Sequence, residues 1–174
     1  MAHQQQFDFV KAVSRVYPDN FKNAKVLEVG SLDINGSVRQ FFTDCDYIGI
    51  DLGEGKGVDV VCQGQEYDAP ADSFDTVISC ECFEHNPEWI YTFANMWRMT
   101  KPNGLIIMSC ATTGRPEHGT RRTTPDDAPF CGDYYKNLTE QDFVEQFNLD
   151  KMFSTYEFGI GHQTCDLYFY GIKE

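Results

Sequence analysis

The sequence predicts an α/β fold: a three-layer sandwich around a mainly parallel, seven-stranded sheet with an antiparallel strand near the C-terminus. Short apolar runs alternate with segments of helical spacing, which is typical of a parallel sheet covered on both faces. The last two apolar runs are joined by "GIGHQTC" with no helix between them, and such a short connection suits an antiparallel pair. The length of 174 residues suits one domain, expected over residues 1–174.

Each element has its own local signal. Strands are expected at 25–30, 46–52, 58–63, 74–80, 105–111, 152–158 and 166–172. Helices are expected at 5–16, 37–42 and 87–100, and a further helix opens at Thr139. Pro18 ends the first helix, and Thr139 with Asp142 three residues later resembles a capping box.

Composition excludes several classes of protein. The 14 basic and 27 acidic residues give a net charge of −13, which argues against nucleic-acid binding. No run of 18 apolar residues predicts a membrane span, and the N-terminus lacks the pattern of a secretory signal, so a cytoplasmic protein is expected. The seven cysteines lack zinc-site spacing, so we expect reduced thiols and no metal site. The sequence carries no signal of oligomeric state.

Polar and small residues gather where the predicted strands end. In an open parallel sheet, ligands bind at the carboxyl ends of the strands. The residues expected there are Gly30, Ser31, Asn35 and Gly36 after the first strand, Asp51 after the second, Gln63, Gly64 and Gln65 after the third, and Cys80, Glu81, Cys82, Glu84 and His85 after the fourth. A carboxylate at Asp51 could accept hydrogen bonds from two ribose hydroxyls, so this edge predicts a nucleotide-like ligand.

Together these segments resemble the class I S-adenosylmethionine-dependent methyltransferases, of the small methyltransferase-11-like kind. "VLEVGS…NG" resembles the glycine-rich first motif of that family, and "YIGIDL" resembles the second, with Asp51 as the ribose acid. "FDTVISCECFEHNPEW" resembles the fourth-strand motif, and "MWRMTKPNGLIIMS" the turn and fifth strand. The resemblance covers about residues 25–111, and the last two strands match the closing hairpin of the family.

The resemblance implies a Rossmann-like transferase. It would bind S-adenosyl-L-methionine, pass the methyl group to a small polar or anionic metabolite, and release S-adenosyl-L-homocysteine. The cofactor-binding residues implied are Glu28, Gly30, Ser31, Asn35, Gly36, Asp51, Leu52, Gly64, Gln65, Cys80, Glu81 and His85. Methyl transfer from a sulfonium depends on alignment more than on acid–base groups, so no catalytic triad is expected.

Three departures from the family pattern stand out. Leu32-Asp33-Ile34 lengthens the first motif, and this insertion either bulges outward or enters the pocket. Gln65 stands in place of an acid after the third strand. Asn103 replaces a glycine in the turn before the fifth strand, where asparagine also accepts a positive φ.

The segment 112–138, between the fifth strand and the next helix, is expected to face the substrate. A connection this long without predicted structure is usually functional or mobile. Arg115, Arg121 and Arg122 are its candidates for gripping an anionic substrate, although they could instead pair with nearby acids such as Asp126, Asp127 and Asp133. The candidates for a base or an orienting group are His118, Tyr134 and Tyr135.

Two alternatives stay open. A nicotinamide-dependent oxidoreductase shares the strand, glycine loop and acid, but the sequence lacks Gly-x-Gly-x-x-Gly and has no room for a substrate domain. A non-catalytic relative that binds the cofactor without turnover would fit the altered first motif and the uncharged Gln65.

Overall fold

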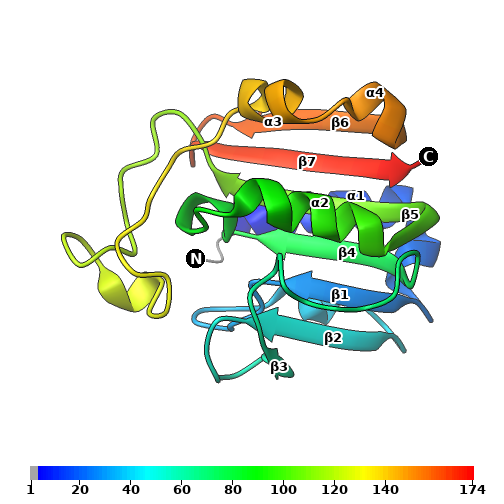
Figure 1. Cartoon of the computed structure of the whole chain (residues 1–174), viewed down its shortest axis with the longest axis horizontal. Coiled ribbons are helices and arrows are strands. Elements are labelled where there is room, and N and C mark those ends of the chain that lie inside the picture. The colour runs from blue at the N-terminus through cyan, green and yellow to red at the C-terminus, as the bar shows by residue number, and fades with distance from the viewer. Residues whose placement is uncertain (1–3) are drawn as a thin grey trace.

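The computed structural model describes residues 4–174, and they form a seven-stranded sheet with helices on both faces (Figure 1). The strands are β1 (Lys25–Val29), β2 (Asp46–Asp51), β3 (Val60–Val61), β4 (Phe74–Cys80), β5 (Thr100–Ala111), β6 (Phe153–Gly161) and β7 (Asp166–Lys173). Their order across the sheet is β3-β2-β1-β4-β5-β7-β6. Only β7 runs antiparallel to its two neighbours, so the predicted fold class and its single reversed strand are confirmed.

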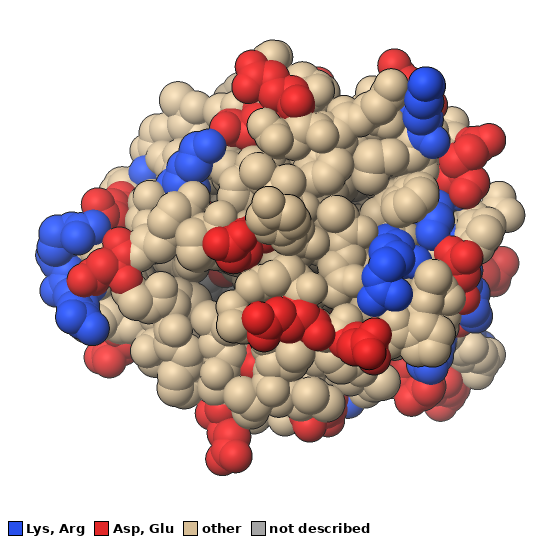
Figure 2. Space-filling model, viewed as in Figure 1, with Lys and Arg blue, Asp and Glu red and all other residues tan. Residues whose placement is uncertain are grey.

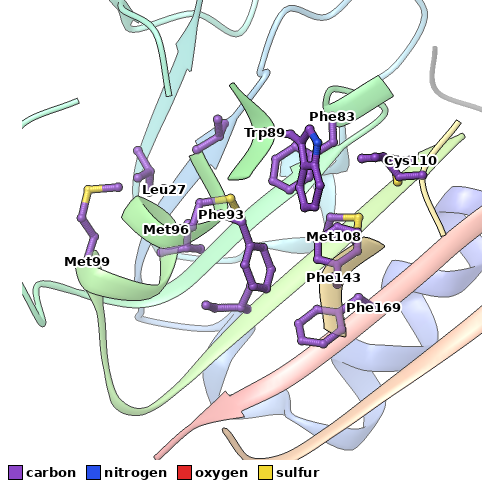
Figure 3. Close-up of a cluster of buried hydrophobic side chains, with 14 of the residues drawn as sticks. Leu27, Phe83, Trp89, Phe93, Met96, Met99, Met108, Cys110, Phe143 and Phe169 are labelled. Carbon is purple, nitrogen blue, oxygen red and sulfur yellow. The ribbon is translucent and has the colours of Figure 1, made fainter. Parts of the chain in front are cut away.

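Helices α2 (Trp89–Met99), α3 (Glu140–Gln146) and α4 (Leu149–Met152) cover one face of the sheet. Figure 3 shows Phe93 and Met96 of α2 lying among side chains of the sheet and of α3, including Leu27, Met108 and Phe143. Phe93 is fully buried and contacts several aromatic rings, which makes it the centre of this cluster. The predicted capping box at the start of α3 is present, since Thr139 and Asp142 bond to each other's backbone N–H.

Helix α1 (Gln4–Val16) covers the opposite face, together with the short 3₁₀ turns at Pro18–Phe21 and Val38–Phe41. Val10 and Val13 of α1 pack with the alternate side chains of the central strands, among them Val26 and Ile107. Because successive strand residues point to opposite faces, β1, β2, β4, β5 and β7 contribute to both clusters. The sheet is therefore the middle layer of a three-layer sandwich.

Two expected elements are shorter in the structure. The helix expected at 37–42 is only the 3₁₀ turn Val38–Phe41, because Phe42 takes an extended conformation and stacks on Phe21 with 4.5 Å between ring centroids. The strand expected at 58–63 pairs over Val60–Val61 alone. The chain between β2 and β4 contains no helix, so β3 reaches its place at the edge of the sheet through loops alone.

The turn expected before the fifth strand lies within β5, whose first residues pair irregularly with β4. Asn103 has a φ of +62°, the conformation for which asparagine is a tolerated substitute for glycine. Strand β5 starts earlier than expected, at Thr100, because Thr100 pairs with Phe74 before an irregularity resets the register. Within residues 4–174, no helix combines the length and apolar character that crossing a membrane requires.

Candidate functional site

A cavity of about 280 Å³ opens at the carboxyl ends of β1, β2 and β4. Small-molecule sites usually have about 300–1,000 Å³, so this one is compact. All twelve residues predicted to bind a cofactor line it: Glu28, Gly30, Ser31, Asn35, Gly36, Asp51, Leu52, Gly64, Gln65, Cys80, Glu81 and His85. The sheet topology brings them together, since parallel neighbouring strands end at one edge.

The loop after β1 needs its first glycine. Gly30 has a φ of +81°, and a Cβ added there would lie 2.7 Å from Cβ of Cys82. Both facts exclude a larger residue without rearrangement. The next residue, Ser31, is 2% exposed, and its hydroxyl has no hydrogen-bond partner among the described residues. The Ser31 side chain packs on Gly49, where an added Cβ would lie 2.7 Å from its hydroxyl oxygen, so Ser31 lines the cavity while its hydroxyl is buried against β2.

The insertion Leu32-Asp33-Ile34 bulges outward at one residue and enters the pocket at the other two. Asp33 turns away from the cavity, where its carboxylate accepts a hydrogen bond from Gly36 N–H at 2.7 Å and pairs with Lys56 at 2.6 Å. Leu32 and Ile34, on either side, line the cavity. The insertion is thus folded against the β2–β3 connection and contributes two apolar side chains to the wall.

Asp51 stands at the end of β2 with both carboxylate oxygens engaged. Backbone N–H groups of Leu32 and Leu52 donate to them at 2.9 and 2.7 Å. Burial raises the pKa of Asp51, against the lowering effect of these hydrogen bonds. A carboxylate offers about four acceptor sites, and the backbone N–H of Gly53 also bonds to Asp51, so roughly one site remains for a ligand.

Glu28 lies inside the sheet at the cavity floor and is 5% exposed. The hydroxyl of Tyr47 donates a hydrogen bond to its carboxylate at 2.9 Å. Burial raises the pKa of Glu28 from 4.5 to about 8, although the Tyr47 hydrogen bond lowers it. Glu28 can therefore change its charge near neutral pH.

Gln65 is held by a short network. Its amide donates to the side-chain oxygen of Gln63 at 2.7 Å and accepts from Thr92 at 3.2 Å. Gly64 lies against Thr92 as well, since a Cβ added at Gly64 would be 2.7 Å from its methyl group. The amide is thus positioned at the cavity wall by α2.

The 3₁₀ turn Phe83–His85 follows β4 and is buried. Burial raises the pKa of Glu84 from 4.5 to about 8 and lowers the pKa of His85 from 6.5 to about 3. Neither the Glu84 carboxylate nor the His85 ring nitrogens have a hydrogen-bond partner among the described residues. His85 lines the cavity, whereas Glu84 lies behind it.

Part of the predicted substrate-side segment roofs the cavity. Asp127 to Cys131, overlapping the 3₁₀ turn Pro125–Asp127, lie on its wall. The ring of Phe130 rests on Gly53, where a Cβ would be only 2.3 Å from the ring. Sequence analysis missed this contact, although a phenylalanine within a polar segment is a signal that could have found it.

Other lining residues also escaped prediction. They are Gln6, Val29, Leu32, Ile34, Ser37, Val38, Ile50, Cys62, Asn86, Pro87 and Glu88, besides the roof; Gln63 and Cys82, expected at the strand ends, also line the cavity. Most flank a predicted residue by one or two positions. Gln6 is different, because it comes from α1 and its presence depends on how that helix packs.

The predicted substrate-binding arginines lie outside this cavity. Arg115 pairs with Asp166 at 2.8 Å, Arg121 lies 3.7 Å from Asp133, and Arg122 pairs with Glu117 at 2.7 Å.

Figure 2 shows basic and acidic side chains intermixed at the left end of the molecule, where Figure 1 places the loop of this segment. The arrangement corresponds to the second interpretation that the sequence allowed, in which these arginines pair with acids.

The predicted base candidates are close to the cavity without lining it. His118 packs edge-on against His85, with 4.9 Å between ring centroids, and Tyr135 packs on His118 at 5.0 Å. Tyr135 donates its hydroxyl hydrogen bond to the carbonyl of Pro116. Tyr134 makes no ring contact with either histidine in the described structure.

The charge of the cavity wall is of one sign. Its described lining residues include no lysine or arginine but four acids, Asp51, Glu81, Glu88 and Asp127, besides Glu28, which its raised pKa keeps mostly protonated at neutral pH. A cleft lined by one sign of charge concentrates ligands of the opposite sign. The wall therefore favours a ligand that carries positive charge.

Comparison with known structures places the fold. A Burkholderia thailandensis 1,6-didemethyltoxoflavin-N1-methyltransferase, solved with its substrate and S-adenosylhomocysteine, matches with a TM-score of 0.67 and 17% identity over 96% of this chain and 77% of its own. A Haemonchus contortus phosphoethanolamine N-methyltransferase 2 matches with a TM-score of 0.64 and 16% identity, over 95% of this chain and 53% of its own.

The YcgJ protein of Bacillus subtilis matches over nearly its whole length, with a TM-score of 0.63, 11% identity and coverage of 96% of this chain and 98% of its own. Identities this low establish the fold alone. The comparison with curated proteins finds no match. A family model described as a methyltransferase domain matches residues 1–150, most of the chain. On this match, supported by the seven-stranded sheet, the chain belongs to the methyltransferase domain family.

Proposed function

We propose that this protein transfers a methyl group from S-adenosyl-L-methionine to a small polar acceptor. The observation that carries the proposal is the cavity at the ends of β1, β2 and β4, with Gly30 and Asp51 on its wall. Asp51 keeps acceptor capacity for a ribose hydroxyl beyond its backbone hydrogen bonds, and Gly30 lets a ligand approach the backbone. The solved relatives with bound S-adenosylhomocysteine support the same donor.

The residues present fit this cofactor. Gln65 offers an amide that α2 holds in place at the cavity wall. The acidic wall suits the positive charges of the sulfonium and the amino group of the methionine part. Bound there, the cofactor would supply the methyl group, and the chain would bind and orient the two reactants and exclude water.

The size of the cavity supports a small acceptor. A volume of about 280 Å³ with the roof over it leaves little space beyond the cofactor, and methyltransferases of similar fold act on small molecules such as didemethyltoxoflavin. The lack of basic lining residues favours a polar acceptor that is uncharged or cationic. An anionic acceptor would need Arg115, Arg121 or Arg122 to leave its acidic partner.

The test is a turnover assay on a pool of small polar metabolites, read as homocysteine released from S-adenosylhomocysteine by a coupling enzyme. Cofactor-dependent release that needs an added acceptor supports the proposal. Binding of S-adenosylhomocysteine without release from any acceptor would instead indicate a non-catalytic relative.

Binding of a nicotinamide cofactor with no binding of S-adenosylhomocysteine would contradict the proposal outright.

A further inference from the structure

Beside the cavity, Glu84, His85 and His118 bring together polar atoms that have no hydrogen-bond partner among the described residues. Glu84 is fully buried and His85 is 3% exposed, yet both carboxylate oxygens and both ring nitrogens lack hydrogen bonds within the described residues. His118 adds a buried Nε2 atom, also without a partner. One ligand atom from each of the three lies within 4.8 Å of the other two.

The two histidines are arranged as metal ligands usually are. His118 places its Nδ1 3.1 Å from the carbonyl of Pro116, so Nδ1–H donates there and Nε2 keeps its lone pair. Ligating histidines commonly fix their tautomer through such a backbone carbonyl. The Tyr135 ring packs against both His85 and His118, and holds the two imidazoles near each other.

Backbone contacts hold the loop that carries His118 against the turn that carries Glu84 and His85. The backbone N–H of Lys136 donates to the carbonyl of Glu84 at 2.8 Å and ties the substrate-side segment to the turn after β4. Gly119, next to His118, has a φ of +69°, and a Cβ there would lie 2.6 Å from Cε1 of His85. Only glycine lets this segment lie directly on the His85 ring.

We propose that Glu84, His85 and His118 form a binding site for a divalent transition-metal ion. Buried polar atoms normally have hydrogen-bond partners. Atoms of three side chains that converge without such a partner indicate that the three share a ligand. Two imidazoles and one carboxylate suit zinc, manganese, iron or cobalt better than magnesium or calcium, which prefer all-oxygen sites. Bond lengths of about 2.0–2.2 Å require the three ligand atoms to move closer together on binding.

The cysteine spacings of the sequence predict no metal site. The adjacent pair Glu84-His85 could have suggested one, but its third ligand comes from the loop, more than thirty residues later. Only the fold brings His118 to the pair.

The site also bears on the acceptor, and this step rests on the proposed function. His85 lines the cavity, so an ion that it binds lies at the cavity wall. Three protein ligands leave positions for water or for an oxygen of a second molecule. The acceptors that such an ion would help to hold carry hydroxyl oxygens.

The experiment titrates Co²⁺ into the full, untagged chain after chelator treatment, with calorimetry for affinity and visible absorption for ligand type. We expect one equivalent to bind through nitrogen and oxygen, without a thiolate charge-transfer band. His118→Ala and Glu84→Gln should each weaken binding at least tenfold. His162→Ala, which removes an exposed histidine of the β6–β7 turn, should leave it unchanged.

Three outcomes would overturn the site: no binding of Co²⁺, Zn²⁺ or Mn²⁺ at micromolar concentrations, undiminished binding by both variants, or thiolate bands from cysteine ligation. If Glu84→Gln does not fold, His118→Ala in the loop decides the question.

Asp51→Asn separates this inference from the proposed function. It should bind cobalt like the wild type while losing S-adenosylhomocysteine, so either proposal can fail alone.

Discussion

Replacing Glu28 by glutamine should make the protein more stable at alkaline pH. Burial holds the pKa of Glu28 at about 8 in the folded chain, against 4.5 ordinarily. Between these two values the folded state binds more protons than the unfolded state, so the contribution of Glu28 to stability falls as the pH rises. Glutamine resembles the protonated carboxyl and can still accept the Tyr47 hydrogen bond.

The magnitude follows from the width of that pH window. A gap of about 3.5 pH units, from 4.5 to about 8, at about 1.4 kcal/mol for each unit, gives a difference of up to roughly 5 kcal/mol. Against a typical total stability of about 5–15 kcal/mol, this is a large effect. Wild type and Glu28→Gln should therefore be similarly stable near pH 5 and differ by at least ~2 kcal/mol at pH 9.

Urea unfolding of the ligand-free protein at several pH values measures the difference. Glu157→Gln is the matched control, because exposed Glu157 also accepts a hydrogen bond from a tyrosine, Tyr170, but has no burial cost to relieve. Parallel stability curves for the wild type and Glu28→Gln from pH 5 to pH 9 would refute the reasoning.

Three further predictions concern the walls and supports of the site. Gly30→Ala combines a positive φ with a contact of 2.7 Å to Cys82, so urea unfolding should show a loss of about 2–4 kcal/mol. Asp33→Ala removes the carboxylate that holds Gly36 N–H and should weaken S-adenosylhomocysteine binding several-fold in calorimetry, by loosening the insertion. Lys173→Met leaves three hydrogen-bond acceptors without their buried ammonium partner and should cost about 2–4 kcal/mol by thermal or urea unfolding.

Matched variants sharpen these measurements. Gly132→Ala shares the positive φ but has open space around it, so it should lower the free energy of unfolding by only about 1–2 kcal/mol. If Gly30→Ala lowered it by no more than Gly132→Ala, the packing argument would be contradicted. Lys56→Ala removes only the exposed partner of Asp33 and should change stability by less than ~1 kcal/mol. Lys151→Met replaces an exposed lysine, and a loss as large as that of Lys173→Met would argue against the buried network.

The sequence was sufficient for the sheet and for the position of the site. Apolar runs such as Val26–Val29 and Phe74–Cys80 lie between two packed layers, and that burial leaves a continuous signal in the sequence. The residues that follow each run must meet at one edge once the strands are parallel. This is why Gly30, Asp51 and Glu81, far apart in the chain, could be assigned to one cavity.

What could not be predicted depends on contacts between distant segments. The end of the 37–42 element is set by Phe42 stacking on Phe21, and the roof of the cavity by Phe130 packing on Gly53. The arginines of segment 112–138 find acids whose proximity only the folded loop creates. Local spacing carries no information about such contacts.

The central claim is that Asp51 and the cavity around it bind the nucleoside part of S-adenosyl-L-methionine, and calorimetry with S-adenosylhomocysteine tests it most directly. Asp51→Asn should weaken binding by about ten- to a hundredfold, because it removes charge-assisted hydrogen bonds worth ~1.5–3 kcal/mol. Asp46→Asn, at the exposed amino end of the same strand, should bind like the wild type. Equal affinity of Asp51→Asn and wild type, or no binding by the wild type at millimolar ligand, would contradict the account.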